Sequence, residues 1–308
     1  MKRTKIISFI AVAAATLCST QAWAGATYFK NLSLTVKNPE TAKGRVYLTP
    51  HNSSDTSFCT ISKKPEVAKV EGNLSNVGAG FYVDMFVFPA DGYVLDCLTT
   101  PKAYASGNYR SEYVGSTKGY PLSSNKIAID NDTLHNCTTT RPSAGANMAP
   151  VSSMELYAIF VPAKKAEVRF SRAGTLESAV KACTYGEAVN DLKVTGPLGE
   201  SDIAYLNSLS REKGLVRLDL TRASFTEIPD SAFYNSGLYE LKLPNWVKRM
   251  GDYAFANSMG LMPVTIPDGA TVSKTATSGC ALMKMLGKKG DDDNNGLYLL
   301  LDSLLFGI

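Results

Sequence analysis

Leu215-Val-Arg-Leu-Asp-Leu220 and Leu238-Tyr-Glu-Leu-Lys-Leu243 open two similar units of the sequence, and Leu261-Met-Pro-Val-Thr-Ile266 opens a third. The first leucines of successive units are 23 residues apart. Self-similarity at a constant period in the twenties is typical of proteins built from stacked coils, in which each unit buries its apolar face against the next. The stretch from Leu215 to Pro267 therefore predicts a solenoid, and the rest of the chain is organised around it.

Each unit begins with the pattern of a half-buried strand. Leu218 and Leu220 alternate with the polar residues Arg217 and Asp219, which is the two-residue period of a strand with one face in a core. The equivalent inward positions are predicted to be Leu241 and Leu243 in the second unit and Val264 and Ile266 in the third. A proline follows each of these two strands and ends it, because proline has no N–H to donate to the next strand.

The second half of each unit places a small residue beside a large one. Ile228-Pro-Asp-Ser-Ala-Phe233 and Met250-Gly-Asp-Tyr-Ala-Phe255 end in Ala-Phe, where alanine lets the coils approach and phenylalanine fills the space between them. Together with L-x-x-L-x-L-P, this pattern resembles the BspA-type leucine-rich repeat of bacterial surface proteins. The cysteine that usually follows Ala-Phe-x-Asn is replaced by Ser236 and Ser258. The resemblance implies extracellular binding or adhesion to a host or community surface protein, without catalysis.

Residues 173–214 resemble the N-terminal cap that precedes this type of repeat. Thr175 is a predicted N-cap of a helix, Leu192-Lys-Val-Thr-Gly196 reads as a strand, and Ser201-Asp-Ile-Ala-Tyr-Leu206 begins a second capped helix. Leu192 lies 23 residues before Leu215, which places its strand one coil before the first unit.

After the third strand the repeat pattern is expected to decay. Residues 270–277 read Ala-Thr-Val-Ser-Lys-Thr-Ala-Thr, without the Gly-x-x-Ala-Phe of the earlier units. A solenoid that stops needs a cap, since an open edge strand invites pairing with another chain. The tail, residues 281–308, is expected to be that cap, or the protein is shortened relative to its relatives.

The chain begins as an exported protein does. The basic start Met1-Lys-Arg-Thr-Lys5 precedes an apolar run and the A-x-A site Ala22-Trp-Ala24, so residues 1–24 are predicted to be a cleaved secretory signal peptide. Its loss leaves 29 basic against 28 acidic residues, without a basic stripe, which argues against nucleic acid as a partner. No other apolar run is long enough to span a bilayer. We expect a secreted, cell-surface or periplasmic protein.

Residues 25–170 read as β-structure. Strand-like runs, separated by Gly, Pro, Asn and Asp clusters, lie at 32–36, 45–48, 81–88, 92–95, 126–129 and 154–161. Phe88-Pro-Ala-Asp-Gly-Tyr93 and similar phrases loosely resemble the β-repeat modules of bacterial surface proteins, which implies a spacer or stalk. The predicted fold is multidomain: an all-β N-terminal module, residues 25–170, then a short α/β leucine-rich-repeat solenoid, residues 171–280, and the tail.

A polar loop with four tyrosines is predicted between Thr99 and Asn125. Its aromatic residues are Tyr104, Tyr109, Tyr113 and Tyr120, among serine and glycine. Tyrosine with serine and glycine is typical of adaptable binding loops, and a surface of this kind also suits carbohydrate. The simpler interpretation, which we favour, is that the tyrosines lie back on the sheet.

Five cysteines remain after removal of the leader. They are Cys59, Cys97, Cys137, Cys183 and Cys280. An exported protein meets an oxidising compartment, so a bridge from Cys97 to Cys59 or to Cys137 is permitted. The number of cysteines is odd and their spacing is scattered, so buried free thiols are as well supported as a disulfide.

The predicted ligand surface is the outward face of the repeat strands. Its residues are Arg217, Asp219, Glu240, Lys242 and Thr265. The 23-residue offset places Arg217 beside Glu240 and Asp219 beside Lys242, so opposite charges on adjacent strands can compensate one another. The face covers on the order of 300 Å², whereas a stable interface needs ~800 Å² per partner. We therefore expect a firm partner to touch the first domain as well.

The tail contains a calcium-loop pattern. Oxygen ligands at loop positions one, three, five, seven and twelve would be Asp291, Asp293, Asn295, Leu297 through its carbonyl, and Asp302. The segment resembles half of a dockerin-type module, which implies an assembly role in which the tail binds Ca²⁺. Dockerins carry two such loops and this chain has one. An acidic turn before an apolar end is the alternative.

Nothing in the sequence argues for catalysis. The chain contains two histidines, His51 and His135, and no G-x-S-x-G, H-E-x-x-H or Gly-rich phosphate loop. The sequence therefore predicts a non-catalytic binding protein that acts through its repeats. Docking through the calcium-loop tail and carbohydrate binding by the β-rich module are the alternatives.

Overall fold

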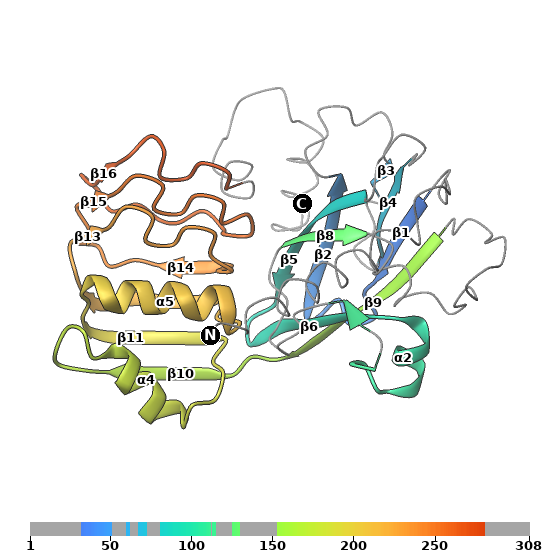
Figure 1. Cartoon of the computed structure of the whole chain (residues 1–308), viewed down its shortest axis with the longest axis horizontal. Helices are drawn as coiled ribbons and strands as arrows, with labels where there is room; N and C mark the ends of the chain where they lie inside the picture. The colour runs from blue at the N-terminus through green and yellow to red at the C-terminus, as the bar shows by residue number, and fades with distance from the viewer. Residues whose placement is uncertain are drawn as a thin grey trace, which may run out of the picture.

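The computed structural model describes residues 32–50, 60–61, 67–72, 81–111, 113–114, 125–129 and 153–280. Figure 1 shows two lobes side by side, which are a β-module ending at Pro162 and a repeat region that begins at Lys165. The predicted signal peptide, residues 1–24, and the tail, residues 281–308, lie outside the described residues.

Two sheets make up the β-module. The larger has the order β3-β4-β1-β9-β6-β7 and the smaller has the order β2-β5-β8. All neighbouring strands are antiparallel except β1 and β9, which run parallel. The strands are β1 Leu32–Lys37, β2 Gly44–Pro50, β3 Thr60–Ile61, β4 Val67–Gly72, β5 Phe81–Pro89, β6 Tyr93–Thr99, β7 Tyr113–Val114, β8 Asn125–Ile129 and β9 Ser153–Pro162.

Six strands of the module coincide with the six predicted runs, and β3, β4 and β7 were not predicted. The module is rich in sheet, as predicted, but it also contains one short helix that was not expected, α2 Pro101–Ser106. The Thr100 side chain accepts a hydrogen bond from the N–H of Ala103 at 3.2 Å, and Gly107 ends the helix in the left-handed conformation. A six-residue helix is too short to show the 3.6-residue period that sequence analysis relies on.

The repeat region has two parallel sheets, with the orders β10-β11-β12-β14 and β13-β15-β16. Two helices precede the first full coil (Figure 1). The elements are β10 Lys165–Arg169, α4 Leu176–Thr184, β11 Asp191–Pro197, α5 Glu200–Glu212, β12 Arg217–Ser224, β13 Glu227–Ile228, β14 Glu240–Lys242, β15 Arg249–Met250 and β16 Thr271–Val272. Because β10 pairs in the repeat sheet, this sheet begins before residue 170, where the sequence placed the domain boundary.

The strands stack in the register that the period predicts. Leu218 lies opposite Leu241, and Met250 lies opposite both Ile228 and Val272 in the second sheet. One prediction of register is wrong: Leu192 pairs with Leu218 rather than lying one 23-residue coil before Leu215. The 13 residues of α5 fill this coil and lengthen it. The coil from Leu192 to Leu218 is 26 residues long and the next, from Leu218 to Leu241, is 23, so three extra residues are accommodated while the apolar column stays stacked.

The third unit continues past Pro267, contrary to the expected decay. Thr271 and Val272 form β16 against β15, and the buried Ala276 accepts a hydrogen bond from the Phe255 N–H at 2.8 Å. Pairing between neighbouring coils needs only backbone groups and one small buried side chain. A coil therefore forms here although the Gly-x-x-Ala-Phe motif is absent. A second expectation is also wrong, because Ile266 is 47% exposed and its segment forms no strand.

One turn of each coil requires a left-handed backbone. Asn235, Asn257 and Gly279 occupy equivalent positions 22 residues apart, with φ of 53°, 61° and 73°. Asparagine and glycine adopt this region at the lowest steric cost. The choice of these residues therefore keeps the turn geometry constant from coil to coil.

The next position forms a buried polar column. The Ser258 hydroxyl donates to the carbonyl of Phe233 at 2.9 Å, and the Cys280 Sγ donates to the carbonyl of Phe255 at 2.8 Å. Ser236 heads the same column and lies 3.1 Å from the Ser258 hydroxyl. Serine can thus replace the usual cysteine here, because the position needs a small donor to the preceding coil, and cysteine returns in the third coil.

A single buried carboxylate caps both helices of the repeat region. Asp202, which is 2% exposed, accepts hydrogen bonds from the N–H groups of Leu176 at 3.0 Å, Gly174 at 2.7 Å and Gly199 at 2.9 Å. Thr175 occupies the predicted N-cap position of α4 but makes no capping bond. Asp202 therefore satisfies N–H groups that helix starts leave unpaired.

Candidate functional site

The outward face of the four-stranded sheet carries two rows of charged side chains. Alternate residues of a strand point to the same face, and the four strands are in register. The charge changes sign at every step along each row and between the rows. The first row is Lys165, Asp191, Arg217 and Glu240, and the second row is Glu167, Lys193, Asp219 and Lys242. These eight residues are named the charged grid below.

Four of the eight grid residues were predicted from the sequence. The predicted neighbours Arg217 with Glu240 and Asp219 with Lys242 are opposite one another in the sheet. The other four members were missed because β10 was assigned to the β-module and the register of β11 was taken as 23 residues. The predicted residues of β12 and β14 already alternate in charge. Extending this alternation to β11 and the edge strand β10 would have identified the other four.

Neighbouring charges of the grid compensate one another. The Lys165 ammonium lies 3.6 Å from the Asp191 carboxylate, and that of Lys242 lies 2.9 Å from Glu240. Partial burial alone would raise the pKa of Asp219, but hydrogen bonds from Thr221 and the nearby lysines outweigh it and lower the pKa. Exposed pairs of this kind contribute ~0–1 kcal/mol each. The grid is consequently neutral overall and stabilises the fold little.

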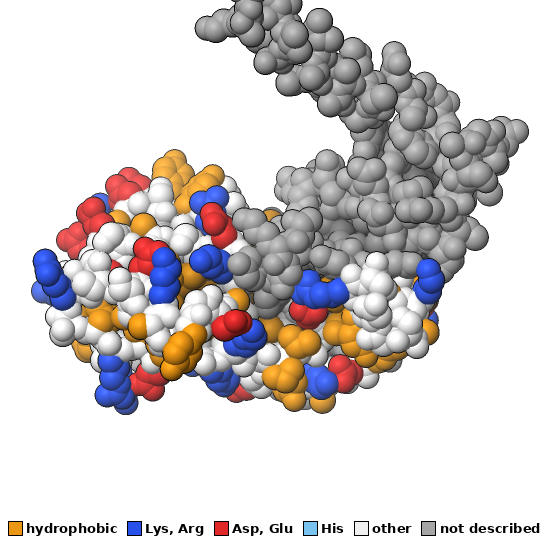
Figure 2. Space-filling model, turned by 60° about the horizontal axis from the view of Figure 1, so that its bottom comes forward, with side chains coloured by type: hydrophobic (Ala, Val, Ile, Leu, Met, Phe, Trp, Pro, Cys, Tyr) orange, Lys and Arg blue, Asp and Glu red, His pale blue; other side chains and the backbone are white. Residues whose placement is uncertain are grey.

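A groove of about 470 Å³ lies between the grid and the β-module. The turn formed by Asp91 and Gly92 of the module lines one side, and the grid lines the floor. Figure 2 shows acidic and basic side chains interspersed over the described surface in that view, without a large patch of one sign. The groove is therefore a composite of both lobes and offers charges of both signs to a ligand.

Arg217 fixes the two lobes together. Its guanidinium donates to the carbonyls of Tyr93 at 2.8 Å and of Pro89 and Ala90 at 3.0 Å each. The prediction that Arg217 is an exposed ligand residue is wrong in its geometry, because the residue is only 6% exposed. Its Nε, 3.7 Å from Glu240, has no hydrogen-bond partner. The spacing of the repeats could not predict that Arg217 binds carbonyl oxygens of the neighbouring lobe.

An aromatic pair packs beside this arginine. The Arg217 guanidinium carbon lies 5.7 Å from the ring centre of Tyr239, and the Tyr239 ring meets Phe88 edge to face at 6.2 Å. Burial raises the pKa of Tyr239. A guanidinium over an aromatic face gains cation–π attraction that increases as water is excluded. The contact between the lobes is thus a packed arginine–aromatic cluster.

Comparison with known proteins agrees with the repeat geometry. Residues 209–286 match the model of the BspA type leucine rich repeat region, in six copies. The repeats are of the BspA type. This repeat family is typically a non-enzymatic module that binds proteins. No curated protein matches the chain.

Thr265 lies apart from the grid in the BspA-type repeats. It is exposed, as predicted, but its segment forms no strand and does not line the groove. Asp219, Glu240 and Lys242 do line the groove. Three of the five predicted ligand residues are therefore together and accessible, one is buried and one is remote.

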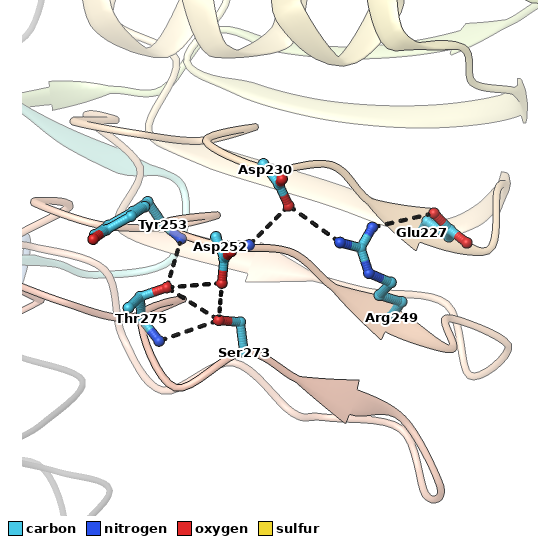
Figure 3. Close-up of polar contacts among 7 residues, drawn as sticks. All are labelled: Glu227, Asp230, Arg249, Asp252, Tyr253, Ser273 and Thr275. Atoms are coloured by element: carbon cyan, nitrogen blue, oxygen red, sulfur yellow. Dashed lines mark hydrogen bonds and ion pairs between the residues drawn. The ribbon is translucent and has the colours of Figure 1, made fainter.

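The opposite edge of the BspA-type repeats carries a ladder of aspartates (Figure 3). Asp230 accepts hydrogen bonds from the Asp252 N–H at 2.9 Å and from Arg249 at 3.3 Å. Asp252 in turn accepts from the hydroxyls of Ser273 and Thr275 in the next coil, and these bonds lower its pKa. Each carboxylate is used to hold the following coil, which is a structural role.

The tyrosines of the module pack on one another. Tyr104 of α2 stacks on Tyr157 of β9 with ring centres 4.2 Å apart, and Tyr109 stacks on Tyr104 at 5.9 Å. This confirms for Tyr104 the interpretation in which the tyrosines lie back on the sheet, whereas Tyr109 stacks on Tyr104 and is 38% exposed. The side chains of Tyr113 and Tyr120 lie outside the described residues.

No disulfide joins the cysteines in the described part of the chain. Cys97 is a buried free thiol whose pKa is raised by burial to about 12, and Cys183 is free and exposed. Neither permitted bridge from Cys97 forms, and its predicted partners Cys59 and Cys137 lie outside the described residues.

Two absences hold for the described residues. No group of three or more His, Cys, Asp and Glu side chains among them is arranged to hold a metal ion. None of their helices has the length and apolar character needed to cross a membrane. The predicted calcium ligands Asp291, Asp293, Asn295, Leu297 and Asp302, and both histidines, lie outside these residues.

Proposed function

We propose that this chain is an exported, non-catalytic binding protein that recognises an extracellular protein at the bacterial surface. The signal-peptide pattern at the N-terminus and the BspA-type repeats support this role. The observation that carries it is the groove between the charged grid and the Asp91–Gly92 turn. Arg217 holds that turn in place, so both walls of the groove are pre-positioned for a partner.

The size of the grid limits what it can do alone. Four strands spaced ~4.8 Å apart give a face on the order of 300 Å², against ~800 Å² per partner in a stable interface. A firm partner of the repeats therefore extends over the turn of the β-module. The grid supplies specificity through charges of both signs, and the module supplies the remaining contact area.

The test is capture of protein from a bacterial or host surface extract by the purified mature chain. We expect Asp91→Lys and Lys242→Glu each to reduce capture of the same partner about tenfold or more, since each reverses a charge in the groove. Lys248→Glu, an exposed change outside the groove, should leave capture unchanged. Full capture by both groove variants would exclude this surface as the binding site.

A further inference from the structure

Lys193 is the member of the charged grid that lacks a partner. Its side chain lines the groove and is half-buried. Within the residues that the structure describes, its ammonium makes no hydrogen bond or ion pair, whereas every other member of the grid makes at least one. A charge that has lost part of its hydration without gaining a partner is a place where an incoming ion of opposite sign is favoured.

The two acidic residues beside Lys193 are engaged along their own strands. Glu167 of β10 lies opposite Lys193 in the sheet, but its carboxylate contacts the Arg169 guanidinium at 3.0 Å. Asp219 of β12 lies opposite Lys193 on the other side, and its Oδ1 accepts from the Thr221 N–H at 2.9 Å and from the Thr221 hydroxyl at 2.6 Å. The groove therefore holds an ammonium whose nearest carboxylates are already in use.

We propose that Lys193 binds an aspartate or glutamate side chain on an extended segment that the partner inserts into the groove. The proposal rests on the proposed function and names the chemistry that the groove selects. An ammonium has three N–H donors and no acceptor, so all three donors of Lys193 are free for a carboxylate. Hydrogen bonds between two charged groups are roughly twice as strong as those between neutral groups.

The shape of the groove favours a narrow segment over a flat surface. The Pro89–Tyr93 turn stands over Arg217, on the strand next to that of Lys193, as its three hydrogen bonds to that arginine show. A broad protein face would meet the turn before it reached the sheet. The groove of about 470 Å³ lies within the ~300–1,000 Å³ of pockets that hold small ligands, so it accommodates a few residues of chain.

The charges around Lys193 favour a single carboxylate over a more strongly charged anion. Glu167 and Asp219 flank it, and Asp191 precedes it by two residues on the same strand. A phosphate group carries up to two negative charges, so these carboxylates would repel it more than they repel an acidic side chain. An acidic sugar has the same single charge, but BspA-type repeats typically bind proteins, which favours a peptide.

Selection from a random heptapeptide library on the immobilised mature chain tests the proposal. We expect the wild type to enrich aspartate or glutamate at one position about five- to tenfold over its frequency in the library. Lys193→Glu should reverse this preference toward lysine and arginine. Lys193→Gln should remove it without reversal, which keeps the test decisive if circular dichroism shows that Lys193→Glu is not folded. Lys248→Gln, exposed and outside the groove, should select as the wild type does.

Thr221, which does not line the groove, provides an independent readout. Thr221→Val removes the hydroxyl bond to Asp219, whose carboxylate can then pair with Lys193. Calorimetric titration with an enriched acidic peptide should show binding about threefold weaker or more. Asp219→Asn should instead strengthen binding, and adding Thr221→Val to Asp219→Asn should change nothing further. An equal loss in the Asp219→Asn background would mean that Thr221 does not act through Asp219, and would count against the proposal.

Two outcomes would overturn the proposal outright. The first is selection of no acidic residue by the wild type, or of the same acidic residue by both Lys193 variants. The second is binding of polygalacturonate that depends on Lys193 without binding of acidic peptides, which would assign the carboxylate to a sugar. Neither outcome bears on the capture of a surface protein, which is tested separately by Asp91→Lys and Lys242→Glu.

Discussion

At the scale of the residue, Arg217 shows how the neighbourhood changes the meaning of a repeat position. In the sequence it is an outward polar residue of a strand, equivalent to Glu240 of the next coil. In the structure it is buried beneath a turn of another lobe and bonded to three carbonyl oxygens. A guanidinium has several donors in a planar fork, which lets one side chain satisfy three acceptors.

The first prediction concerns Arg217→Lys. Lysine keeps the charge but cannot reach three carbonyls in the same plane, so at least one carbonyl of the 89–93 turn loses its donor. We expect the free energy of unfolding to fall by ~2–4 kcal/mol, measured by chemical denaturation. Arg222→Lys on the same strand, where the residue is exposed, should change stability by less than about 0.5 kcal/mol. Equal effects of both changes would contradict the role of Arg217.

The second prediction uses the pKa of Asp252. Hydrogen bonds from Ser273 and Thr275 lower it from its ordinary value of 3.8. As pH falls, the unfolded chain takes up a proton before the folded chain does. The stability from Asp252 is therefore complete well above pH 3.8 and is lost as pH falls through the lower pKa of the folded protein.

Asp252→Asn removes this titration. We expect the unfolding free energy of the variant to fall less steeply than that of the wild type between pH 5 and pH 3. The matched change Asp268→Asn at an exposed turn provides the comparison. A wild-type slope in the Asp252→Asn variant would show that these hydroxyl bonds do not form in solution.

At the scale of the element, the coil is specified by a few positions, and the sequence reveals some of them. The leucine column and the pairing of Leu218 with Leu241 were predictable because alternation and period are visible in the letters. The coil around β16 was missed because the backbone pairs without the motif. The register of β11 was missed because a helix of 13 residues lengthens its coil without altering the apolar pattern.

The third prediction concerns the turn before the Ala-Phe pair. A Cβ at Gly251 would lie 2.7 Å from the backbone nitrogen of Asp230 and closer still to its carboxylate. Gly251→Ala should therefore push the two coils apart and cost ~1–3 kcal/mol of unfolding free energy. Gly199→Ala, whose Cβ meets its nearest neighbour at 3.6 Å, should cost less, ~0.5–1 kcal/mol, because there alanine only replaces glycine at the N-cap of α5. Thermal unfolding of both variants would decide, and an unaffected Gly251→Ala protein would contradict this packing.

At the scale of the whole molecule, the two lobes are joined, within the part of the chain that the structure describes, by the arginine–aromatic cluster around Arg217. At this joint the Arg217 guanidinium donates to a backbone carbonyl of the β-module and lies over the Tyr239 ring. The Tyr239 ring in turn packs against Phe88 of the module. The functional consequence is that the groove exists only while the lobes stay docked. That a firm partner touches both domains stays a prediction, and no repeat pattern encodes which turn of the module packs on Arg217.

The fourth prediction follows from this joint. The wild-type mature chain should unfold in one calorimetric transition, because a docked interface couples the two lobes. Replacing both Arg217 and Tyr239 with alanine should separate the trace into two transitions, one for each lobe. Replacing Arg222 and Tyr234, which are exposed, should leave a single transition. Two transitions in the wild type would show that the lobes are energetically independent.

The charged grid also has a consequence for how the protein meets its surroundings. Charges that alternate every ~4.8 Å produce fields that cancel within a short distance of the face. The grid therefore neither attracts nor repels a polyelectrolyte from afar, and encounters should occur at the unsteered rate of ~10⁵–10⁶ M⁻¹s⁻¹, largely indifferent to ionic strength. At the bacterial surface that we propose as its location, such a face would interact only with a surface that comes close enough for individual charges to pair.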